Sequence, residues 1–285
     1  MSFKYINPGF NIGDFATMTQ YNAKSGESSS GTKLAETAIF YLPTTTKIIF
    51  LSLTCTWGRL WRALAYNDNG VKETGIYFDN YVGTLRLNNT TNTKTNPMPR
   101  GVANWYIKIF SDAQAGEFAI YRDGIQIFAY TGNVMDGDDI AKIDFYAKSS
   151  TDDYLANIII SDEYFPPSEK IIALPVANTT ATMADNGDGS YTADEVGETV
   201  MQTIDAAKLT QIIGEGNTLT GFSLIGNPAY YDGTELTHLG AMKGETVKES
   251  VALPTNTDGK ILASWSDNVK QADIANLSLG WKAQV

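Results

Sequence analysis

Apolar and polar residues alternate through much of the first 165 residues, a pattern that predicts β-strands. The clearest case is GEFAIYRDGIQIFAY, residues 116–130, in which two alternating runs flank Asp123-Gly124. Asp-Gly between two such runs is a strong signal for a β-hairpin. The other predicted strands are Ala38–Leu42, Lys47–Thr56, Trp61–Tyr66, Thr74–Phe78, Thr84–Leu87, Trp105–Phe110, Ala141–Tyr146 and Leu155–Ser161. Because no 3.6-residue period accompanies them, these short strands predict a sandwich or a barrel.

The polar segment Asn88–Asn96 (NNTTNTKTN) separates two of the predicted strands. It contains no apolar residue that would anchor it to a core. We therefore expect a polar loop that is mobile at its tip.

The later part of the chain is also rich in strand patterns and contains one predicted helix. Asp205 is a suitable N-cap for a helix over Ala206–Ile213, and Gly214 is a suitable end. The predicted strands are Thr218–Ile225, Glu235–Met242, Thr246–Leu253, Lys260–Trp265 and Asn276–Gln284. No repeat of solenoid length is visible.

A break in composition falls at Phe165-Pro166-Pro167. Phe, Tyr and Trp number 26 in residues 1–165 and 6 in the remaining 120, and all five Arg precede the break. The formal charge is −3 before it and −8 after it. Adjacent prolines lack backbone donors and interrupt a strand ladder. We therefore predict two domains, a larger one at 1–165 and a smaller β-rich one at 166–285.

Charge and the rare residue types exclude several classes of site. A net charge of −11 disfavours nucleic acid as a partner, because binding phosphates requires clustered Lys and Arg. The single histidine, His238, excludes any site with two imidazoles, and the single cysteine, Cys55, excludes an intrachain disulfide. The chain begins without a recognisable secretory signal, and its longest apolar run, residues 47–57, is too short and too polar to span a bilayer. We expect a soluble protein made in a cytosol.

Two acidic segments are candidates for calcium. In ADNGDGSYTADE, residues 184–195, Asn186, Asp188, Gly189 and Glu195 occupy positions 3, 5, 6 and 12 of an EF-hand loop, but Ala184 at position 1 supplies no ligand. A turn between two strands is the favoured interpretation. The second segment, NVMDGDDI, supplies Asp136, Asp138 and Asp139. It is interpreted chiefly as a solvated turn, with calcium as the alternative.

No catalytic motif is apparent. A jelly-roll glucanase carries Glu-x-Asp-x-x-Glu on one strand, and that string is absent; the nearest acidic pairs are Asp152-Asp153 and Asp162-Glu163, beside strands. No phosphate-binding loop is present. Trp57, Trp61 and Trp105 are suitable by type for stacking on sugars, although core positions are the commoner place for tryptophan in a sandwich. We predict no catalytic residue, no cofactor and no metal site.

Residues 1–165 resemble a concanavalin A-like (laminin G-like) jelly roll. The resemblance rests on the order of an early NPGF…GDF, a central IIFLSLTCTWGRLWRALAYNDNG, the pair NWYIKIF…GEFAIYRDGIQIFAYTGNV and a final LANIIISDEYF. It implies an all-β fold, a jelly-roll sandwich followed by a smaller, sandwich-like β domain. That fold hosts both binding proteins and enzymes.

The rest of the chain is similar to virion proteins of tailed bacteriophages. The segments involved are IIISDE, KIIALPV, GDGSYTADEVGE and the terminal SWSDNVKQADIANLSLGWKAQV. In that family the last strand follows a Trp-Thr-x-Ala-x-Val-Asn turn, whereas this chain has Trp265-Ser266-Asp267 and Asp273-Ile274-Ala275-Asn276.

The phage resemblance implies a non-enzymatic structural protein of the tail, the neck or the capsid surface. Its implied partners are other virion proteins and further copies of itself, and its implied location is the virion. The alternative hypothesis, compatible with the first, is a carbohydrate-binding adhesin that recognises host surface glycans. A glycan-cleaving enzyme is a third hypothesis, disfavoured by the missing acidic string. No membrane partner is expected.

Overall fold

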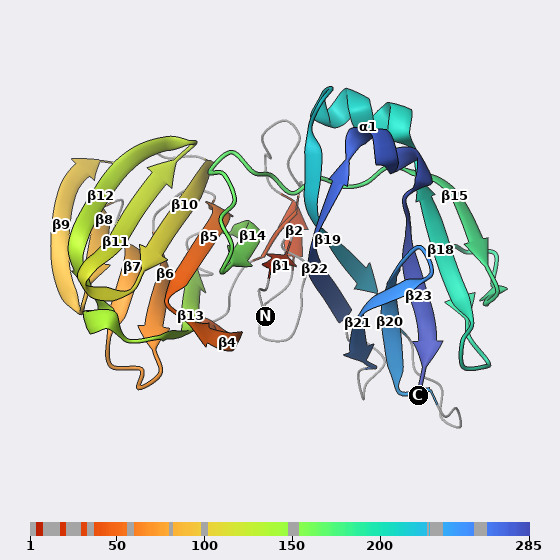
Figure 1. The fold of residues 1–285 in the computed structure, drawn as a ribbon, viewed down its shortest axis with the longest axis horizontal. Coiled ribbons are helices and arrows are strands. Elements are labelled where there is room, and N and C mark those ends of the chain that lie inside the picture. Colours follow the sequence, from red (N-terminus) through yellow and green to blue (C-terminus); the bar gives the residue numbers. More distant parts are fainter. Residues whose placement is uncertain are drawn as a thin grey trace. The chain divides into compact units, whose positions relative to one another are not determined.

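The computed structural model describes residues 4–7, 18–20, 30–32, 37–55, 60–79, 82–97, 102–147, 154–226, 228, 236–253 and 261–285. The chain forms two compact units, Met1–Ile171 and Ile172–Val285, and the predicted all-β fold class is confirmed in both (Figure 1).

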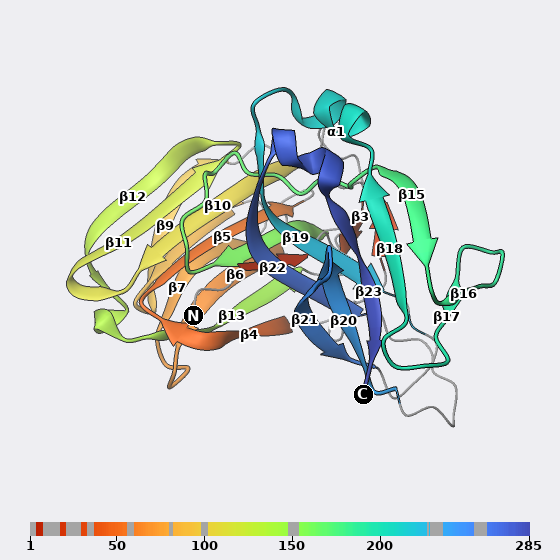
Figure 2. The ribbon, with the colours of Figure 1, turned by 45° about the vertical axis from the view of Figure 1, so that its right-hand side comes forward.

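The first unit is a sandwich of two antiparallel sheets (Figures 1 and 2). The eight-stranded sheet runs in the order β12-β11-β10-β5-β14-β3-β2, with β1 paired to β14. Its strands are β1 (Lys4–Asn7), β2 (Met18–Gln20), β3 (Ser30–Thr32), β5 (Ile48–Cys55), β10 (Ala103–Phe110), β11 (Asp112–Arg122), β12 (Ile125–Val134) and β14 (Leu155–Ser161). The six-stranded sheet, in the order β4-β13-β6-β7-β8-β9, comprises β4 (Thr37–Thr46), β6 (Leu60–Asn67), β7 (Glu73–Asp79), β8 (Val82–Leu87), β9 (Thr90–Pro97) and β13 (Ile140–Ala147).

The core between these sheets explains the period-2 pattern of the sequence. Alternate residues of β6, β7 and β13, such as Ala63, Ile76 and Phe145, contact Leu51 and Ile107 of the other sheet in one cluster. Trp61 stacks on Phe78, with ring centroids 4.7 Å apart, and Trp105 packs edge-on to Phe78 at 5.0 Å. Burial of these large side chains is the main source of stability of the sandwich.

The segment that follows β14 packs on the first unit. Phe165 is 3% exposed and packs in a cluster with Phe50 and Tyr106, and Tyr106 Oη donates to the Phe165 carbonyl at 2.8 Å. Glu169 forms an ion pair with Lys4 of β1. The two compact units therefore divide between Ile171 and Ile172, later than the Phe165-Pro166 boundary predicted from composition.

Tight turns connect the hairpins of the first unit. Asp123 and Gly124 both have positive φ (52° and 81°), the conformation that a two-residue hairpin requires, and join β11 to β12 as predicted. Asn88 and Asn89 adopt φ of 49° and 65° between β8 and β9 in the same way. The prediction of a polar loop over Asn88–Asn96 is therefore wrong, because Thr90–Pro97 is a strand paired with β8. Its β-branched threonines suit an extended backbone, which outweighs the missing apolar pattern.

The second unit has a five-stranded sheet in the order β15-β18-β23-β20-β21 and a two-stranded sheet of β19 and β22. Its strands are β15 (Val176–Ala181), β18 (Thr199–Ile204), β19 (Thr218–Gly226), β20 (His238–Lys243), β21 (Thr246–Ala252), β22 (Ile261–Lys270) and β23 (Ser278–Gln284), with a small hairpin of β16 (Ala184–Asp185) and β17 (Tyr191–Thr192). One apolar cluster, which includes Phe222, Trp265 and Leu279, joins the two sheets.

The predicted helix of the second unit is confirmed as α1 (Ala206–Ile213). Asp205 caps it by accepting from the Lys208 amide at 2.9 Å, and Gly214, at φ 80°, ends it. Leu209 is fully buried and packs in the same cluster as Ile274, which lies in the 3-10 helix η3 (Gln271–Asn276). Within the described ranges, no helix has the length and apolar character needed to cross a membrane.

Candidate binding face of the six-stranded sheet

The outward face of the six-stranded sheet carries a dense set of tyrosines and charged residues. On β6, β7 and β13 the residues next to Ala63, Ile76 and Phe145 point away from the core, because successive side chains of a strand alternate between its two faces. We call this set the tyrosine face: Tyr41, Arg62, Tyr66, Glu73, Tyr77, Arg86, Lys142, Asp144 and Tyr146.

The strand register places these residues in rows across the sheet. Lys142 lies opposite Tyr66, which lies opposite Glu73 on the next strand. In a second row, Tyr146 lies opposite Arg62, which lies opposite Tyr77. Directly opposed side chains on neighbouring strands are close enough to interact, so each row is a line of contacts that runs across the strands.

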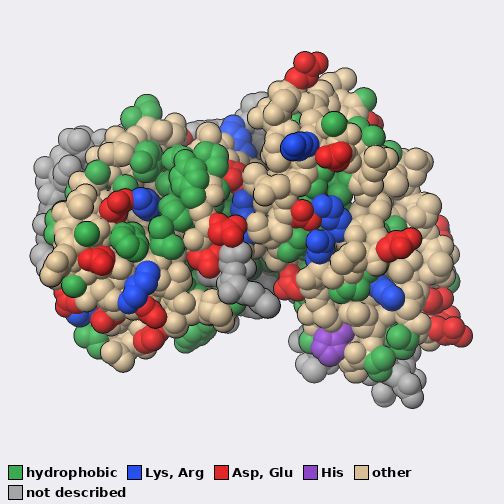
Figure 3. All heavy atoms as spheres, in the orientation of Figure 1, with side chains coloured by type: hydrophobic (Ala, Val, Ile, Leu, Met, Phe, Trp, Pro, Cys, Tyr) green, Lys and Arg blue, Asp and Glu red, His purple; other side chains and the backbone are tan. Residues whose placement is uncertain are grey.

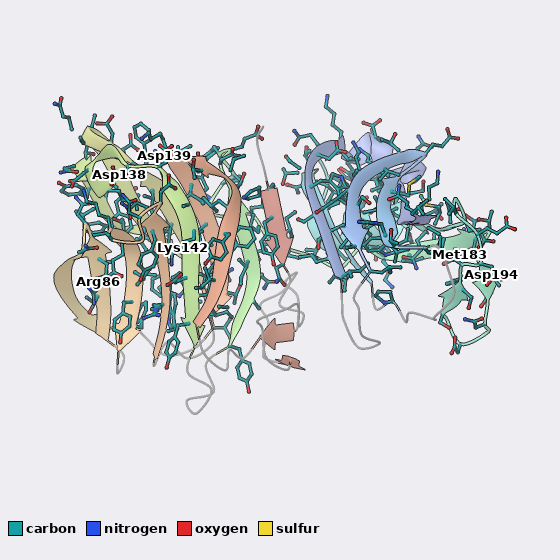
Figure 4. All side chains as sticks on the ribbon, turned by 90° about the horizontal axis from the view of Figure 1, so that it is seen from below. Arg86, Asp138, Asp139, Lys142, Met183 and Asp194 are labelled. Atoms are coloured by element: carbon teal, nitrogen blue, oxygen red, sulfur yellow. The ribbon has the colours of Figure 1, made fainter. Side chains whose placement is uncertain are left out.

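Tyr66 is the centre of the first row. Tyr66 Oη donates to Glu73 Oε2 at 2.7 Å, and Arg86 Nη1 lies 2.7 Å from Glu73 Oε1. On the other side, Lys142 Nζ lies 4.8 Å from the centroid of the Tyr66 ring. One continuous set of contacts therefore joins β13, β6, β7 and β8. Arg86 and Lys142 are labelled in Figure 4 on their strands.

The rows are separated by a row of buried residues. Asp144 lies opposite Leu64, which lies opposite Gly75, and Leu64 is only 2% exposed. A Cβ on Gly75 would lie 2.2 Å from the carbonyl oxygen of Ala63, so a side chain cannot be accommodated there. The exposed layer of the face is consequently formed by the two flanking rows, which contain most of its tyrosines and cations.

Burial raises the pKa values of two residues on this face, Asp144 and Tyr66. Asp144 is 8% exposed, and burial raises its pKa, although Lys142 and Arg62 oppose the shift. Burial also raises the pKa of Tyr66, and the hydrogen bond to Glu73 and its charge add to this, so the hydroxyl stays protonated as a donor. Arg86 Nε is one of several buried polar atoms that lack a hydrogen-bond partner among the described residues; Asp144 Oδ1 also lacks one but lies 3.7 Å from Lys142 Nζ. Buried polar atoms without partners are rare and identify places where structure alone leaves hydrogen-bonding capacity unused.

The tryptophans suggested as sugar platforms are core residues. Trp61 and Trp105 are 0% and 3% exposed and pack around Phe78 between the sheets. The core interpretation of these two is confirmed, and they are not accessible for stacking on a ligand. Trp57 lies outside the described residues.

Of the three aspartates of NVMDGDDI, Figure 4 shows Asp138 and Asp139 next to each other at one end of the sandwich. Lys72 pairs with Asp136 and lies 3.8 Å from Asp138, whose Oδ2 also accepts from Asn67 at 2.9 Å. Lys47 lies 2.6 Å from Asp139. Lysine ammonium groups are therefore positive partners of these carboxylates.

The segment of residues 184–195 contains β16 and β17, joined by a turn over residues 186–190. Its side chains cap its own backbone: Asp185 accepts from Gly187 N at 2.8 Å, and Asp188 accepts from Ser190 N at 2.9 Å. Asn186 donates to Ser190 Oγ at 2.9 Å. The turn interpretation is thus confirmed, and of the candidate calcium ligands Asp188 accepts hydrogen bonds from Ser190 within the turn. Throughout the described ranges, no group of three or more His, Cys, Asp or Glu side chains is arranged to hold a metal ion.

The other residues singled out by type have local roles. Cys55 is 1% exposed in the core, and His238 Nδ1 lies 2.7 Å from Thr237 Oγ1. Asp162-Glu163 follow the end of β14, where the Glu163 amide donates to Ser161 Oγ at 3.0 Å. Asp152-Asp153 lie outside the described residues. None of the described candidates contributes to the tyrosine face.

The sequence did not identify the tyrosine face. Its members are spread over five strands, from Tyr41 to Tyr146, and nothing in the linear order shows which strands are neighbours. The clearest available signal was the alternation of Lys142, Asp144 and Tyr146 in KIDFY. It is interrupted in RALAY, where Leu64 lies between Arg62 and Tyr66.

Comparison with known proteins finds solved structures that resemble about half of this chain. No protein-family model matches the chain, and no curated protein matches it. Among solved structures, a sialidase superposes on 48% of this chain with 11% identity and a TM-score of 0.35, and the chain spans only 16% of that protein. A tetrameric galectin from the ball sponge Cinachyrella sp. is matched over 45% of this chain and 99% of its own, with 14% identity and a TM-score of 0.32. The carbohydrate-binding module CBM66 from Bacillus subtilis is matched over 53% and 98%, with 10% identity and a TM-score of 0.32. The assignment of this chain to the all-β sandwiches rests on its own sheets.

Proposed function

We propose that the first unit binds glycans through the tyrosine face. The observation that carries this proposal is the continuous set of contacts from Lys142 through Tyr66 and Glu73 to Arg86. A sugar hydroxyl both donates and accepts, whereas Arg and Lys only donate and an ionised carboxylate only accepts. Paired side chains that alternate along a row therefore offer donors and acceptors side by side.

The geometry also lowers the cost of binding. Glu73 and Arg86 hold each other in place, so less side-chain freedom is lost when a ligand binds. Tyrosine rings add apolar faces for the C–H surfaces of sugars and hydroxyls for their polar edges. Tyr41, at 69% exposure, is the most accessible of these rings.

We further propose that this face binds without cleaving. Glycoside hydrolysis requires two carboxyl groups with access to the bond that is cleaved. On the tyrosine face, Glu73 is held by Arg86 and Tyr66, and Asp144 is buried. Incubation with any glycan that binds should release no new reducing ends; their appearance would contradict this part of the proposal.

Binding should not depend on calcium. The acidic cluster nearest in type to a calcium site is neutralised by Lys47 and Lys72. A glycan array probed with the full chain in calcium and again in chelator should give the same set of positive glycans. An array with no positive glycan in either condition would refute the proposed function.

Variants then locate the site. Arg86→Ala and Glu73→Gln should each weaken binding of an array hit by about 10-fold or more, because the first removes the cation that holds Glu73 and the second removes the negative charge and one of the two acceptor oxygens. Tyr164→Ala is the matched control, since Tyr164 is 70% exposed but follows β14 of the other sheet. Calorimetric titration of the hit against all three variants measures the effect. If Tyr164→Ala weakened binding and the other two did not, glycans would bind elsewhere.

The phage resemblance supplies a setting in which such a module would act. We propose that the chain is a structural component of a virion, assembled with other virion proteins, whose first unit contacts glycans on the host. This rests on the resemblance of the terminal segment, in which Trp265 lies in β22 and β23 is the central strand of its sheet. Mass spectrometry of purified virions tests it, and absence of the protein from them would exclude the role.

A further inference from the structure

We propose that the tyrosine face selects acidic glycans, whose sugars carry carboxylate or sulfate groups; this rests on the glycan-binding function proposed above. On this face the carboxylates are covered, and the cations that pair with them are the more exposed partners. Anionic oxygens of either kind only accept hydrogen bonds, whereas cationic side chains only donate them.

Two ion pairs of the tyrosine face are more exposed at the cation than at the carboxylate. The side chain of Arg86 is 33% exposed, and that of Glu73 is 16% exposed. The side chain of Lys142 is 23% exposed, and that of Asp144 is 11% exposed. The surface that these pairs offer to a ligand is therefore richer in positive than in negative groups.

Two other ion pairs of the first unit have the opposite arrangement. The side chain of Lys72 is 26% exposed, and that of its partner Asp136 is 45% exposed. On the eight-stranded sheet, Lys108 is 29% exposed and its partner Glu117 is 46% exposed. On the side of the first unit seen in Figure 3, Asp and Glu side chains likewise lie at the surface among Lys and Arg. A covered carboxylate is therefore not a general property of the surface ion pairs of this unit.

The donors of the tyrosine face exceed the acceptors that its own residues supply. Both oxygens of Glu73 have partners, since Oε2 accepts from Tyr66 Oη and Oε1 lies 2.7 Å from Arg86 Nη1. The guanidinium of Arg86 has several further N–H donors, and among the described residues Glu73 is its one ion-pair partner. Lys142 Nζ lies 3.7 Å from Asp144 Oδ1, beyond hydrogen-bond distance. An anionic group on a ligand would supply the acceptors that these donors lack.

Aromatic rings hold two of the cations in place. Lys142 Nζ lies 4.8 Å from the centroid of the Tyr66 ring, and Arg62 Cζ lies 5.4 Å from that of Tyr146. Burial raises the pKa of Asp144, but Lys142 and Arg62 both act to lower it, so both cations lie near this one carboxyl. Cations that are already positioned lose less side-chain freedom when an anionic ligand binds.

The charge on the tyrosine face has the opposite sign to that of the chain. The whole chain carries −11, and residues 1–165 carry −3. The described side chains of the face include the cations Arg62, Arg86 and Lys142 but only two carboxylates, Glu73 and Asp144, so their sum is positive. Acidic glycans are therefore repelled on average by the rest of the chain and attracted to this face.

The glycan array probed with the full chain gives the first test. The positive glycans should be acidic, and their neutral counterparts on the same array should give much weaker signals. Signals that are as strong for the neutral counterparts, or stronger, overturn the inference and leave the proposed function standing. An array without any positive glycan refutes the proposed function and this inference with it.

Calorimetric titration with three forms of one array-positive oligosaccharide then measures the selectivity. The first form carries uronic acid carboxylates, the second has these reduced to primary alcohols, and the third carries sulfates on the neutral backbone. At least one acidic form should bind about 10-fold or more tightly than the neutral form, and the tighter of the two identifies the anionic group. Equal affinity for all three forms overturns the inference.

Variants of Lys142 test whether the selectivity comes from charge on this face. Lys142→Gln should reduce the preference for the acidic over the neutral form by about 3- to 10-fold, and Lys142→Arg, which keeps the charge, should retain most of it. Lys108→Gln is the matched control, because Lys108 is similarly exposed and paired but lies on the eight-stranded sheet. An unchanged preference in Lys142→Gln, or an equal loss in Lys108→Gln, overturns the inference.

Discussion

The same strands form both faces of the six-stranded sheet, but the two faces differ in the kind of contact that they make. On β7, Phe78 is 1% exposed in the core, while its neighbour Tyr77 lies on the tyrosine face. The inward face is held by apolar contact with the second sheet, and the outward face by hydrogen bonds and ion pairs between strands. One period-2 pattern therefore encodes the core on one side of the sheet and, on the other, the polar face that we propose binds glycans.

The largest test of this difference is a pair of neighbouring truncations. Phe78→Ala should destabilise the first unit by about 3–5 kcal/mol, because it removes the ring between Trp61 and Trp105 and leaves a cavity. Tyr77→Ala should cost less than about 1 kcal/mol, since it removes no core packing. Denaturant unfolding of both variants measures this. Equal losses would mean that the outward face contributes to stability as much as the core.

Gly75 tests whether the middle of the outward face tolerates a side chain. Gly75→Ala should cost about 1–3 kcal/mol, because its Cβ would lie 2.2 Å from the Ala63 carbonyl oxygen. Gly70→Ala is the control, because Gly70 also has a positive φ, of 65°. Nothing lies within 4 Å of the Cβ that this substitution would add, so it tests backbone strain without a clash. Thermal unfolding of the two variants compares a clash with backbone strain alone. A smaller loss for Gly75→Ala would contradict the packing described for this row.

A substitution at Tyr66 allows the effect on glycan affinity to be compared with the effect on folding stability. Tyr66→Phe keeps the ring beside Lys142 but removes the hydroxyl that donates to Glu73. We expect a loss of glycan affinity of about 3- to 10-fold and a change in unfolding free energy of about 1 kcal/mol. Titration with an array hit and denaturant unfolding measure the two quantities. Unchanged affinity would exclude the first row as the ligand contact.

Asp144 gives the smallest effect, visible as a change with pH. Its pKa is raised in the folded state, so the fold favours the protonated form and loses stability as pH rises through that pKa. Asp144→Asn removes this loss, and its melting temperature relative to the wild type should be higher at pH 7 than below about pH 3, by roughly 1–3 °C.

Asp112→Asn is a control of opposite sign. Backbone donors from Ala115 and Gln114 lower the pKa of Asp112, so this carboxylate contributes stability above its unfolded pKa, which is lost as pH falls. Asp112→Asn should therefore be relatively less stable at pH 7 than at low pH. The same sign for both variants would show that burial does not control Asp144.

Local patterns predicted much of the fold. The Asp123-Gly124 hairpin, the cap at Asp205 and the helix Ala206–Ile213 were all visible in the sequence, because each depends on residues close together in the chain. Strands without an apolar alternation were not predicted. β9 and β15 are rich in Thr and Asn, and their extended conformation depends on pairing with β8 and β18.

By itself, the sequence determined an all-β chain whose alternating residues form a core, and it excluded sites that need several histidines or cysteines. Only the tertiary structure decided which strands are neighbours. Strand order and register brought Lys142 beside Tyr66 and Glu73 beside Arg86, although these residues lie far apart in the chain or in separate strands. Hydrogen bonds between strands join residues that are distant in the sequence. The order and register of the strands therefore cannot be predicted from the spacing of residues along the chain.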